Sequence, residues 1–454
     1  MKARSVGSNF IWSLSAGLIY ALAQWAVLVA FARLATMEEV GQFALALAIT
    51  APVLLMSRMQ LRTLQATDAR SAFGFEHYLG LMVLNVVAGV AVCCAIATGM
   101  ADSLHAGWVI ALVALAKGFE AVSEVFYGAL QKVERLGLIA RSTIAKSALS
   151  VVLVPLALWL THSPIAGAAA MAFAWAIVLF VFDARALQRE FPGVRPWSTL
   201  WRTPWRKEGA RLKALFLLCW VLGLTALLAA LRPNLPRYLL EVHAGQAELG
   251  MYAALAYFAA LGGRVVHSLG QAVSPRLGRY HAAGDARRYG RALAGFTAAS
   301  AGVGLCAIAG AALLGRWALT LFYGAAYAGN LELFVWLMAA AALEYVCLSL
   351  AVGLTAAREL KGQVVLLVVS VAVVAVGSAV WVPRVGPVGA AWALGLGWVS
   401  ELACSVWLTL RVWRRLTAPE PAQALRTIPP GPVDAREPTA GWVPGVVVED
   451  RKDF

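Results

Sequence analysis

Ionisable side chains inside long apolar segments are the residues of this sequence most able to do chemistry. Arg264 lies near the middle of one such segment, and His267 follows it one helical turn later. A second segment carries Lys117, Glu120 and Glu124 at spacings of three and four, which place them on one face of a helix. A charge inside hydrocarbon costs about 2.5 kcal/mol or more, so such groups usually line a polar cavity. We therefore expect a polar or charged substrate to pass between these segments.

Arg58 and Gln24 extend this candidate lining to two further apolar segments. Arg58 lies toward the end of its segment, four residues before Arg62, and both arginines could instead reach the lipid headgroups. Gln24 shares a helical face of the first segment with Ser13 and Tyr20, at spacings of four and seven. The same pattern is typical of a polar seam between packed helices. Both candidates therefore have a structural alternative.

The acidic residues could act in two other ways. Glu120 or Glu344 could hold Arg264 in a structural ion pair, and Lys117 could simply neutralise Glu120 within its own helix. Glu120, Glu124 and Glu344 could also bind a coupling ion, H⁺ or Na⁺. The sequence does not decide between these roles and contact with the substrate.

Arg237 is the last candidate of the cavity lining. It lies in the longest expected external connection, at about residues 232–248, where Arg232 and Arg237 flank the sequence Pro233-Asn234-Leu235-Pro236. An anchor at the membrane interface is the alternative role for an arginine in such a position.

The composition places these residues in a membrane protein. With 61% hydrophobic residues, 14% charged residues and a mean hydropathy of +0.73, the chain cannot be a soluble domain. Apolar segments long enough to cross about 30 Å of hydrocarbon as helices recur along the chain. We predict an all-α polytopic membrane protein with about twelve transmembrane helices, at residues 10–32, 41–61, 77–98, 107–130, 142–160, 165–187, 212–231, 249–273, 291–314, 331–356, 362–382 and 388–410.

The distribution of basic residues predicts the orientation in the membrane. Most of the 38 Lys and Arg fall on one side if both termini are cytoplasmic, as the positive-inside rule requires. The net charge of +14 is then explained by a cytoplasmic face that meets anionic lipid. We therefore expect membrane lipid as a partner and no nucleic acid.

One long internal connection divides the chain into two halves. Residues 184–211 are rich in arginine and carry Trp197, Trp201 and Trp205 at spacings of four, which is typical of a helix lying in the membrane interface. A proline-rich sequence without apolar periodicity follows the last segment. We predict an N-terminal six-helix bundle (1–190), a cytoplasmic amphipathic linker (191–211), a C-terminal six-helix bundle (212–415) and a disordered cytoplasmic tail (416–454).

The two halves resemble each other at several positions. Three pairs of similar sequences begin or lie within corresponding segments: Glu39-Val40-Gly41 with Glu248-Leu249-Gly250, Glu120 with Glu344, and Pro164-Ile165-Ala166-Gly167 with Pro387-Val388-Gly389-Ala390. Because six is an even number, two such bundles keep the same orientation and are related by an axis along the membrane normal. Secondary transporters place the substrate between halves of this kind.

Several short motifs of the chain resemble a known family. They are Glu39-Val40-Gly41, Arg237-Tyr238-Leu239-Leu240 followed by Gly245, Gly250-Met251-Tyr252-Ala253, Ser274-Pro275, Ala283-Gly284-Asp285 and Tyr323-Gly324. Together they resemble the polysaccharide flippases, the Wzx-type members of the multidrug/oligosaccharidyl-lipid/polysaccharide exporter superfamily. The resemblance covers about residues 5–415, and it favours a functional role for Arg237.

The resemblance implies a V-shaped, two-lobed transporter of the bacterial inner membrane, with a fold like that of the multidrug transporters of the superfamily. The implied cargo is an undecaprenyl-pyrophosphate-linked oligosaccharide, which alternating access moves from the cytoplasmic to the periplasmic leaflet for exopolysaccharide, capsule or O-antigen assembly. A polysaccharide polymerase and a chain-length regulator are the implied protein partners. Arg264 suits this cargo, because arginine pairs well with the oxygens of a phosphate.

Two other functions compete with a flippase. A multidrug or cation antiporter of the same superfamily should have an acidic and aromatic pocket, whereas Arg264, Arg58 and Lys117 favour an anionic cargo. A membrane-embedded polysaccharide polymerase or ligase should have longer external loops than this chain offers. The sequence shows no nucleotide-binding P-loop, metal-ligand spacing or catalytic signature, so we predict neither an enzyme nor a bound cofactor.

Overall fold

The computed structural model describes residues 6–68, 71–100 and 103–417, and the secondary structure of this part is helical. The elements are α1 (Val6–Leu34), α2 (Met37–Arg58), α3 (Leu61–Thr67), α4 (Phe75–Met100), α5 (Leu104–Lys132), α6 (Leu136–Thr161), α7 (Pro164–Ile177), the π-helix η1 (Val178–Asp183), α8 (Ala184–Glu190), α9 (Pro196–Arg202), α10 (Trp205–Ala282), α11 (Ala286–Phe322), the 3₁₀-helix η2 (Ala325–Tyr327), α12 (Leu331–Ala356), α13 (Leu360–Val385) and α14 (Pro387–Thr417). Residues 418–454, which hold nearly all of the expected tail, lie outside the described residues.

The helices account for all twelve expected crossings. Ten described stretches are long and apolar enough to cross a membrane, and one of them, Lys207–Ala282, contains two crossings. Its helix, α10, loses helical backbone geometry at Gly245, where φ is 82°, and glycine adopts this conformation at no steric cost. The 29-residue helix α5 provides the remaining crossing. The chain is therefore a multi-pass membrane protein.

One expected loop is a helix instead. Residues 232–244 continue the first segment of α10, with Pro233 and Pro236 inside the helix, and the chain reverses only at Gly245. Prolines are tolerated in transmembrane helices because neighbouring helices satisfy the freed backbone groups. Arg232 and Arg237 therefore lie within the protein and not in an external connection.

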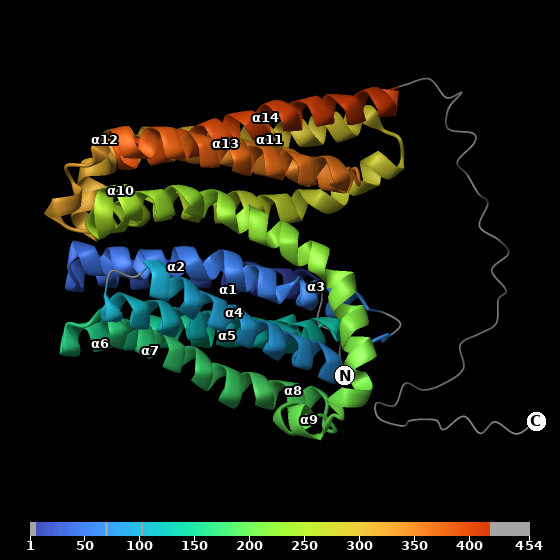
Figure 1. The fold of residues 1–454 in the computed structure, drawn as a ribbon. Coiled ribbons are helices and arrows are strands. Elements are labelled where there is room, and N and C mark those ends of the chain that lie inside the picture. The colour runs from blue at the N-terminus through green and yellow to red at the C-terminus, as the bar shows by residue number, and fades with distance from the viewer. Residues whose placement is uncertain (1–5, 69–70, 101–102, 418–454) are drawn as a thin grey trace, which may run out of the picture.

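The helices form two lobes, which Figure 1 shows one above the other. Helices α1 to α8 pack against one another to form the N-lobe, and α11 to α14 pack with α10 to form the C-lobe. Helix α10 joins the two lobes: it begins beside α9 and buries Leu215 and Cys219 in the N-lobe core before it crosses to the C-lobe. The linker expected at residues 191–211 consists of α9 and the first turns of α10.

The two lobes meet closely at the seam between α2 and α10. A Cβ atom on Gly41 would lie 1.9 Å from the carbonyl oxygen of Gln246, and one on Gly250 would lie 2.6 Å from that of Met37. Gly41 and Gly250 are equivalent positions of the internal repeat seen in the sequence. Their mutual contact is what a two-fold axis between the lobes would produce.

Replacing Gly41 by alanine is expected to destabilise this seam. The new methyl group overlaps backbone atoms that a side-chain rotation cannot move, and overpacking of this kind costs about 1–3 kcal/mol. Thermal unfolding of the detergent-purified protein measures the effect. Gly17→Ala in α1 is the matched control, because nothing lies within 4 Å of its added Cβ. Equal unfolding temperatures for both variants would contradict the tight seam.

Candidate translocation cleft

A cluster of charged side chains lies on the inner side of the N-lobe, with Glu120 of α5 at its centre. One carboxylate oxygen lies 2.7 Å from Nη2 of Arg58 in α2 and 3.3 Å from Nζ of Lys117, and the Tyr20 hydroxyl of α1 donates to the other oxygen at 2.6 Å. Three helices thus contribute to one site. Two cations share one carboxylate, so the cluster keeps a positive charge.

These distances distinguish between the alternative roles of Arg58 and Lys117, which were contact with lipid headgroups for Arg58 and simple neutralisation of Glu120 for Lys117. Arg58 pairs with a residue near the middle of α5 and does not extend to the membrane surface. Lys117 shares Glu120 with Arg58 and lies 4.6 Å from the centre of the Trp175 ring, a favourable position for a cation. The Lys117–Glu120 contact within α5 exists, but it does not neutralise the cluster, because a second cation is present.

The cavity next to this cluster has a volume of about 360 Å³ and is lined by N-lobe residues and by Ala226 of α10. Arg62 of α3 forms an ion pair with Glu124 (3.0 Å) and donates to Gln131 (3.0 Å) at its wall. Met59 and Gln60 separate α2 from α3 with positive φ values of 45° and 55°. This conformation is uncommon outside glycine. The break redirects the chain so that Arg62 meets α5.

Arg264 lies on the C-lobe side of the cleft. It follows Gln246 by 18 residues, about five helical turns, so it lies on the face of α10 that contacts the N-lobe. The opposite face, with Val266, packs on Phe296 and Tyr345 of the C-lobe. Arg264 is exposed and, within the described part of the chain, its guanidinium has no hydrogen bond or ion pair.

The charges of the two lobes are close enough to influence each other. Arg264 acts electrostatically on Lys117 of the N-lobe, and both Arg264 and Glu120 act on Tyr257 of α10. His267 is exposed next to Arg264, with its Nε2 atom 3.2 Å from the Gln271 amide. The cleft therefore contains cations from both lobes, while the alternative ion pair of Arg264 with Glu120 is not formed.

The other predicted residues occupy different places. Gln24 of α1 is half-buried, and its amide nitrogen has no hydrogen-bond partner among the described residues. Arg237 is half-buried inside α10, where it donates to Asn234 at 3.1 Å, and its Nε atom has no partner in the same described part of the chain. Glu344 of α12 lies in the C-lobe near the charges of Arg232 and Glu401. Glu344 thus belongs to a second charged group, away from Arg264.

Glu344 and Arg232 were noted in the sequence, whereas their partner Glu401 and a further ion pair in the N-lobe were not. Arg232 of α10 forms an ion pair with Glu401 of α14 and lies 3.5 Å from the centre of the Trp398 ring. In the N-lobe, Lys146 of α6 lies 3.4 Å from Asp183 of the π-helix. Both groups could have been recognised in the sequence, because their charged residues lie inside or near the ends of predicted apolar segments.

One end of the cleft is closed by contacts between the lobes. Arg33 of α1 donates to the carbonyl oxygens of Thr320 (3.0 Å), Leu321 and Phe322 (2.9 Å) at the end of α11. The Thr320 carbonyl also accepts from the backbone N–H of Gly324 at 3.1 Å. Carbonyls in the last turn of a helix lack regular helical partners, and a cation is favoured at a helix C-terminus. Trp25 of α1 donates to the Tyr323 hydroxyl at 3.0 Å. We call this set of contacts the Arg33 gate.

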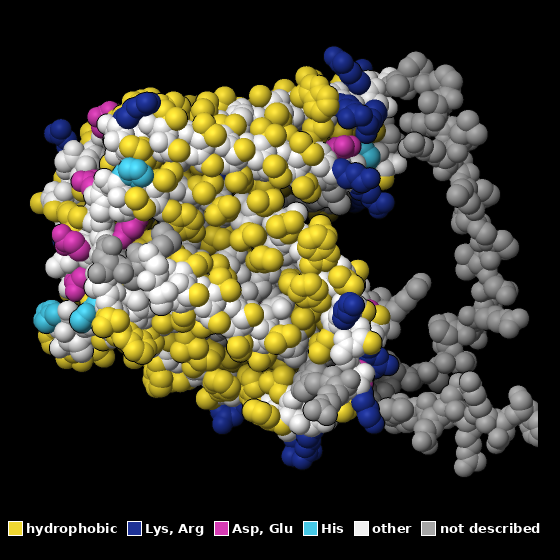
Figure 2. Space-filling model, in the orientation of Figure 1, with side chains coloured by type: hydrophobic (Ala, Val, Ile, Leu, Met, Phe, Trp, Pro, Cys, Tyr) yellow, Lys and Arg dark blue, Asp and Glu magenta, His cyan; other side chains and the backbone are white. Residues whose placement is uncertain are grey.

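The opposite end of the cleft is open. Figure 2 shows a notch between the lobes at the end of the molecule where most visible Lys and Arg side chains gather, whereas Asp and Glu gather at the other end. The cleft thus opens toward the basic end, and the Arg33 gate closes it toward the acidic end.

The chain matches a known protein family. A family described as "Polysaccharide biosynthesis protein" matches residues 6–281. The chain is also similar to the capsular polysaccharide biosynthesis protein CapF of Staphylococcus aureus, with 25% identity over 323 residues, which are 71% of this chain and 78% of CapF.

Solved structures show the same fold. The lipid II flippase MurJ in an inward closed conformation has a TM-score of 0.68 and 10% identity, over 90% of this chain and 89% of that chain. A multidrug resistance transporter of the MATE family in an inward-facing conformation has a TM-score of 0.59 and 14% identity, over 92% and 98%. At these identities the similarity concerns the fold alone.

Proposed function

Because this chain belongs to the polysaccharide biosynthesis protein family, we propose that it is a flippase for a lipid-linked oligosaccharide. The cargo is an oligosaccharide repeat unit on undecaprenyl pyrophosphate, and the direction is from the cytoplasmic to the periplasmic leaflet of the bacterial inner membrane. The exported units serve exopolysaccharide, capsule or O-antigen assembly. In this proposal the protein moves its substrate without changing a covalent bond.

The excess of cations in the cleft is the observation that supports an anionic cargo. Arg58 and Lys117 share one carboxylate on the N-lobe side, and the unpaired Arg264 faces them from the C-lobe. A pyrophosphate loses its water when it enters such a cleft, and arginine and lysine donors replace those hydrogen bonds. An acidic pocket for a cationic drug would need the opposite balance of charge.

The open end of the cleft is proposed to face the cytoplasm, with both chain termini on that side. The basic end of the molecule then meets the cytoplasm, as the positive-inside rule requires. Cargo made in the cytoplasm could enter the cleft from this side. Its polyprenyl chain would remain in the bilayer while the pyrophosphate lies between the lobes.

Binding of the cargo gives a physical reason for the lobes to move. Lys117 and Arg264 carry like charges on opposite sides of the cleft and repel each other, whereas a pyrophosphate between them would attract both lobes. A ligand shifts a conformational equilibrium by its difference in affinity for the two states. A closed basic end with a released Arg33 gate would complete alternating access. Of Glu120, Glu124 and Glu344, we propose Glu344 for the binding of a coupling ion, H⁺ or Na⁺, because the other two carboxylates form ion pairs with cations.

The contacts of the Arg33 gate can be tested by mutation of Arg33. Arg33→Ala is expected to accelerate amide hydrogen exchange about tenfold in the segment around Thr320–Phe322, because the variant loses hydrogen bonds from a charged donor. Hydrogen–deuterium exchange with mass spectrometry measures this rate. Arg316→Ala is the control, since the Arg316 side chain is exposed on the same helix and has no partner in the described part of the chain. Similar exchange in both variants would show that Arg33 does not hold the gate.

Reconstituted transport tests the proposed function. Proteoliposomes receive a fluorescent oligosaccharide on polyprenyl pyrophosphate, and an impermeant glycosidase removes the glycan that reaches the outer leaflet. The expected result is faster loss of glycan than in protein-free liposomes, and the glycan that escapes the glycosidase should not become longer. Rates equal to those of protein-free liposomes would reject a flippase.

The same preparation separates the competing functions. A polymerase or ligase would lengthen or transfer the glycan, which chromatography of the products would reveal. A multidrug antiporter would move a cationic dye across the membrane and leave the glycolipid in place. Co-purification with a polysaccharide polymerase or a chain-length regulator would test the proposed protein partners.

A further inference from the structure

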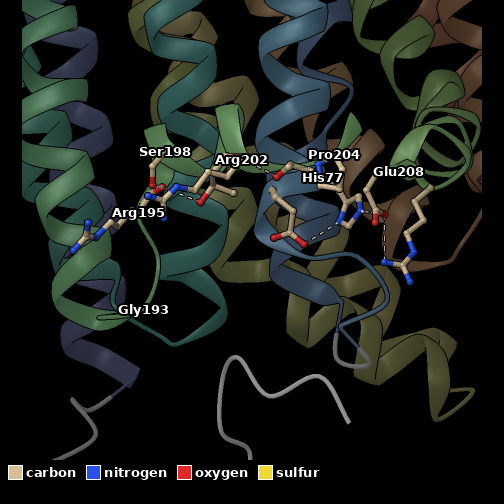
Figure 3. A pocket seen from close by; sticks show the side chains of 11 residues that line it. His77, Gly193, Arg195, Ser198, Arg202, Pro204 and Glu208 are labelled. Carbon is tan, nitrogen blue, oxygen red and sulfur yellow. Dashed lines mark hydrogen bonds and ion pairs between the residues drawn. The ribbon is translucent and has the colours of Figure 1, made fainter. Parts of the chain in front are cut away.

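A second cavity lies outside the cleft, on the basic end of the N-lobe. Its volume is about 490 Å³, and it lies between the start of α4, helix α9 and the start of α10. Figure 3 shows the side chains that line it: Arg195, Ser198 and Arg202 of the α9 region lie on one side, and His77 of α4 and Glu208 of α10 lie on the other. The proposed transport cycle does not use this cavity.

Helix α9 has two different faces, and one of them lines the cavity. Arg195, Ser198, Thr199 and Arg202 follow the spacing i, i+3, i+4 and i+7, which places them together on one side. The other side carries two indoles. Trp197 packs on Phe126 and Phe180 of the N-lobe, with ring centres 5.7 and 4.7 Å apart.

Trp201 indicates that α9 lies in the membrane interface. Its side chain is 89% exposed, although tryptophan is among the largest apolar residues. An exposed tryptophan beside basic residues is typical of segments at the level of the lipid headgroups. The neighbouring cavity would then open at the level of the phosphate groups.

Glu208, one of the two acidic residues that line the cavity, already has hydrogen-bonding partners. The Glu208 carboxylate accepts from Nε2 of His77 at 3.0 Å and lies 3.4 Å from Nη1 of Arg211. His77 is 3% exposed, and its Nδ1 accepts from the backbone N–H of Gly74 at 3.1 Å. His77 is thereby fixed between α4 and α10. The start of α10 cannot move without breaking this contact.

The arginines of α9, by contrast, have no counter-charge. The side chains of Arg195 and Arg202 are exposed and, among the described residues, form no ion pair or hydrogen bond. Glu76 is the other acidic residue of the lining, and it lies beside His77 at the opposite wall. The α9 side of the cavity is therefore positive and open to an anion.

We propose that this cavity binds a phosphate group, held by Arg195 and Arg202 of α9. Arginine is the side chain best suited to phosphate oxygens, and a phosphate here would stabilise α9 against the fixed start of α10. A phospholipid headgroup and a soluble phosphate offer the same chemistry. The position beside Trp201 makes a headgroup accessible, and the experiment separates the two sources.

Native mass spectrometry of the full-length protein tests this site. The detergent-purified protein is mixed with phosphatidylglycerol, and retained lipid is counted in the wild type and in the variant Arg195→Gln/Arg202→Gln. Two basic residues near the surface together strengthen anionic lipid binding roughly thirtyfold, so the variant should retain about thirtyfold less lipid. Arg185→Gln/Arg189→Gln is the matched control, because it removes the same charge from α8 outside the cavity.

The outcomes distinguish the site from general attraction to a basic surface. A loss confined to the cavity variant supports the proposal, and an equal loss in both variants, or in neither, overturns it for lipid. A parallel measurement with millimolar inorganic phosphate detects the soluble source: binding that the cavity variant loses supports a soluble phosphate. If both variants bind lipid and inorganic phosphate like the wild type, the cavity is not a phosphate site. Gel filtration verifies that both variants remain folded.

Discussion

Arg264→Ala is expected to lower glycolipid transport by about tenfold or more while the protein remains in the membrane at its normal level. Hydrogen bonds to a charged group contribute about 1.5–3 kcal/mol each, which corresponds to roughly a tenfold or larger change in rate. Arg264 has no partner within the described residues, so its removal leaves no unpaired charge behind and should not affect folding. The proteoliposome assay and export in cells both measure the effect.

Two further variants identify the cause of this loss. Arg264→Lys keeps the positive charge but loses the paired donors of the guanidinium, so it should retain partial activity. Arg279→Ala removes an exposed, unpaired arginine fifteen residues later in the same helix, beyond the cleft, and should transport normally. Wild-type transport by Arg264→Ala would remove this residue from the mechanism. Equal losses for Arg264→Ala and Arg279→Ala would indicate a general effect of charge.

The ion pair of Lys146 and Asp183 is expected to have the largest effect on stability. Their side chains are 3% and 1% exposed, and Lys146 also donates to the Tyr127 hydroxyl at 3.0 Å. Removing one partner of a buried pair leaves the other charge unpaired, at a cost of about 3–5 kcal/mol. Lys146→Met and Asp183→Leu should therefore each lower the unfolding temperature and the amount of protein in the membrane.

The double variant Lys146→Met/Asp183→Leu should recover much of the stability that either single variant loses. Replacing a whole buried pair by apolar residues is often neutral or stabilising, because neither charge then has to be desolvated. Thermal unfolding of the four proteins in detergent forms the double-mutant cycle. Losses that simply add in the double variant would show that the two side chains do not stabilise each other.

Asp183, the acidic partner of Lys146, lies in a π-helix. Residues 178–183 form the π-helix η1, and Ser142 of α6 donates to the Asp183 carboxylate. A π-helix adds a residue to the helical turn and changes the direction of the following side chains. This change places Asp183 inside the N-lobe, next to Lys146, instead of at the surface of the bundle.

The helices of this protein follow from the sequence alone. Every predicted apolar segment lies within or across the helices of the structure, and the predicted ends differ from the observed ends by a few residues in most cases. The reason is local: a segment in hydrocarbon must satisfy its own backbone hydrogen bonds, so length and apolar composition are sufficient. Arg264, Lys117 and Glu120 were unusual in the sequence, because a charge is costly inside an apolar segment.

The internal repeat was also visible in the sequence, through Gly41 and Gly250. The sequence could not show that these two glycines contact each other's helices, because that contact joins residues about two hundred positions apart. Likewise, Pro233 and Pro236 suggested a loop, but the chain reverses at Gly245, where the backbone adopts a conformation that suits glycine.

Tertiary structure decided which charges meet. Arg58, Lys117 and Tyr20 converge on Glu120 from three helices, while Arg264 stays unpaired across the cleft and Arg33 binds the end of α11 in the other lobe. An ion pair depends on distances of a few ångströms between side chains, and helix packing sets those distances, whereas a hydropathy pattern contains no such information. The sequence thus determined that the chain crosses the membrane as helices with buried charges. Only the packing of the two lobes determined that those charges form a cationic cleft, open at one end and closed at the other.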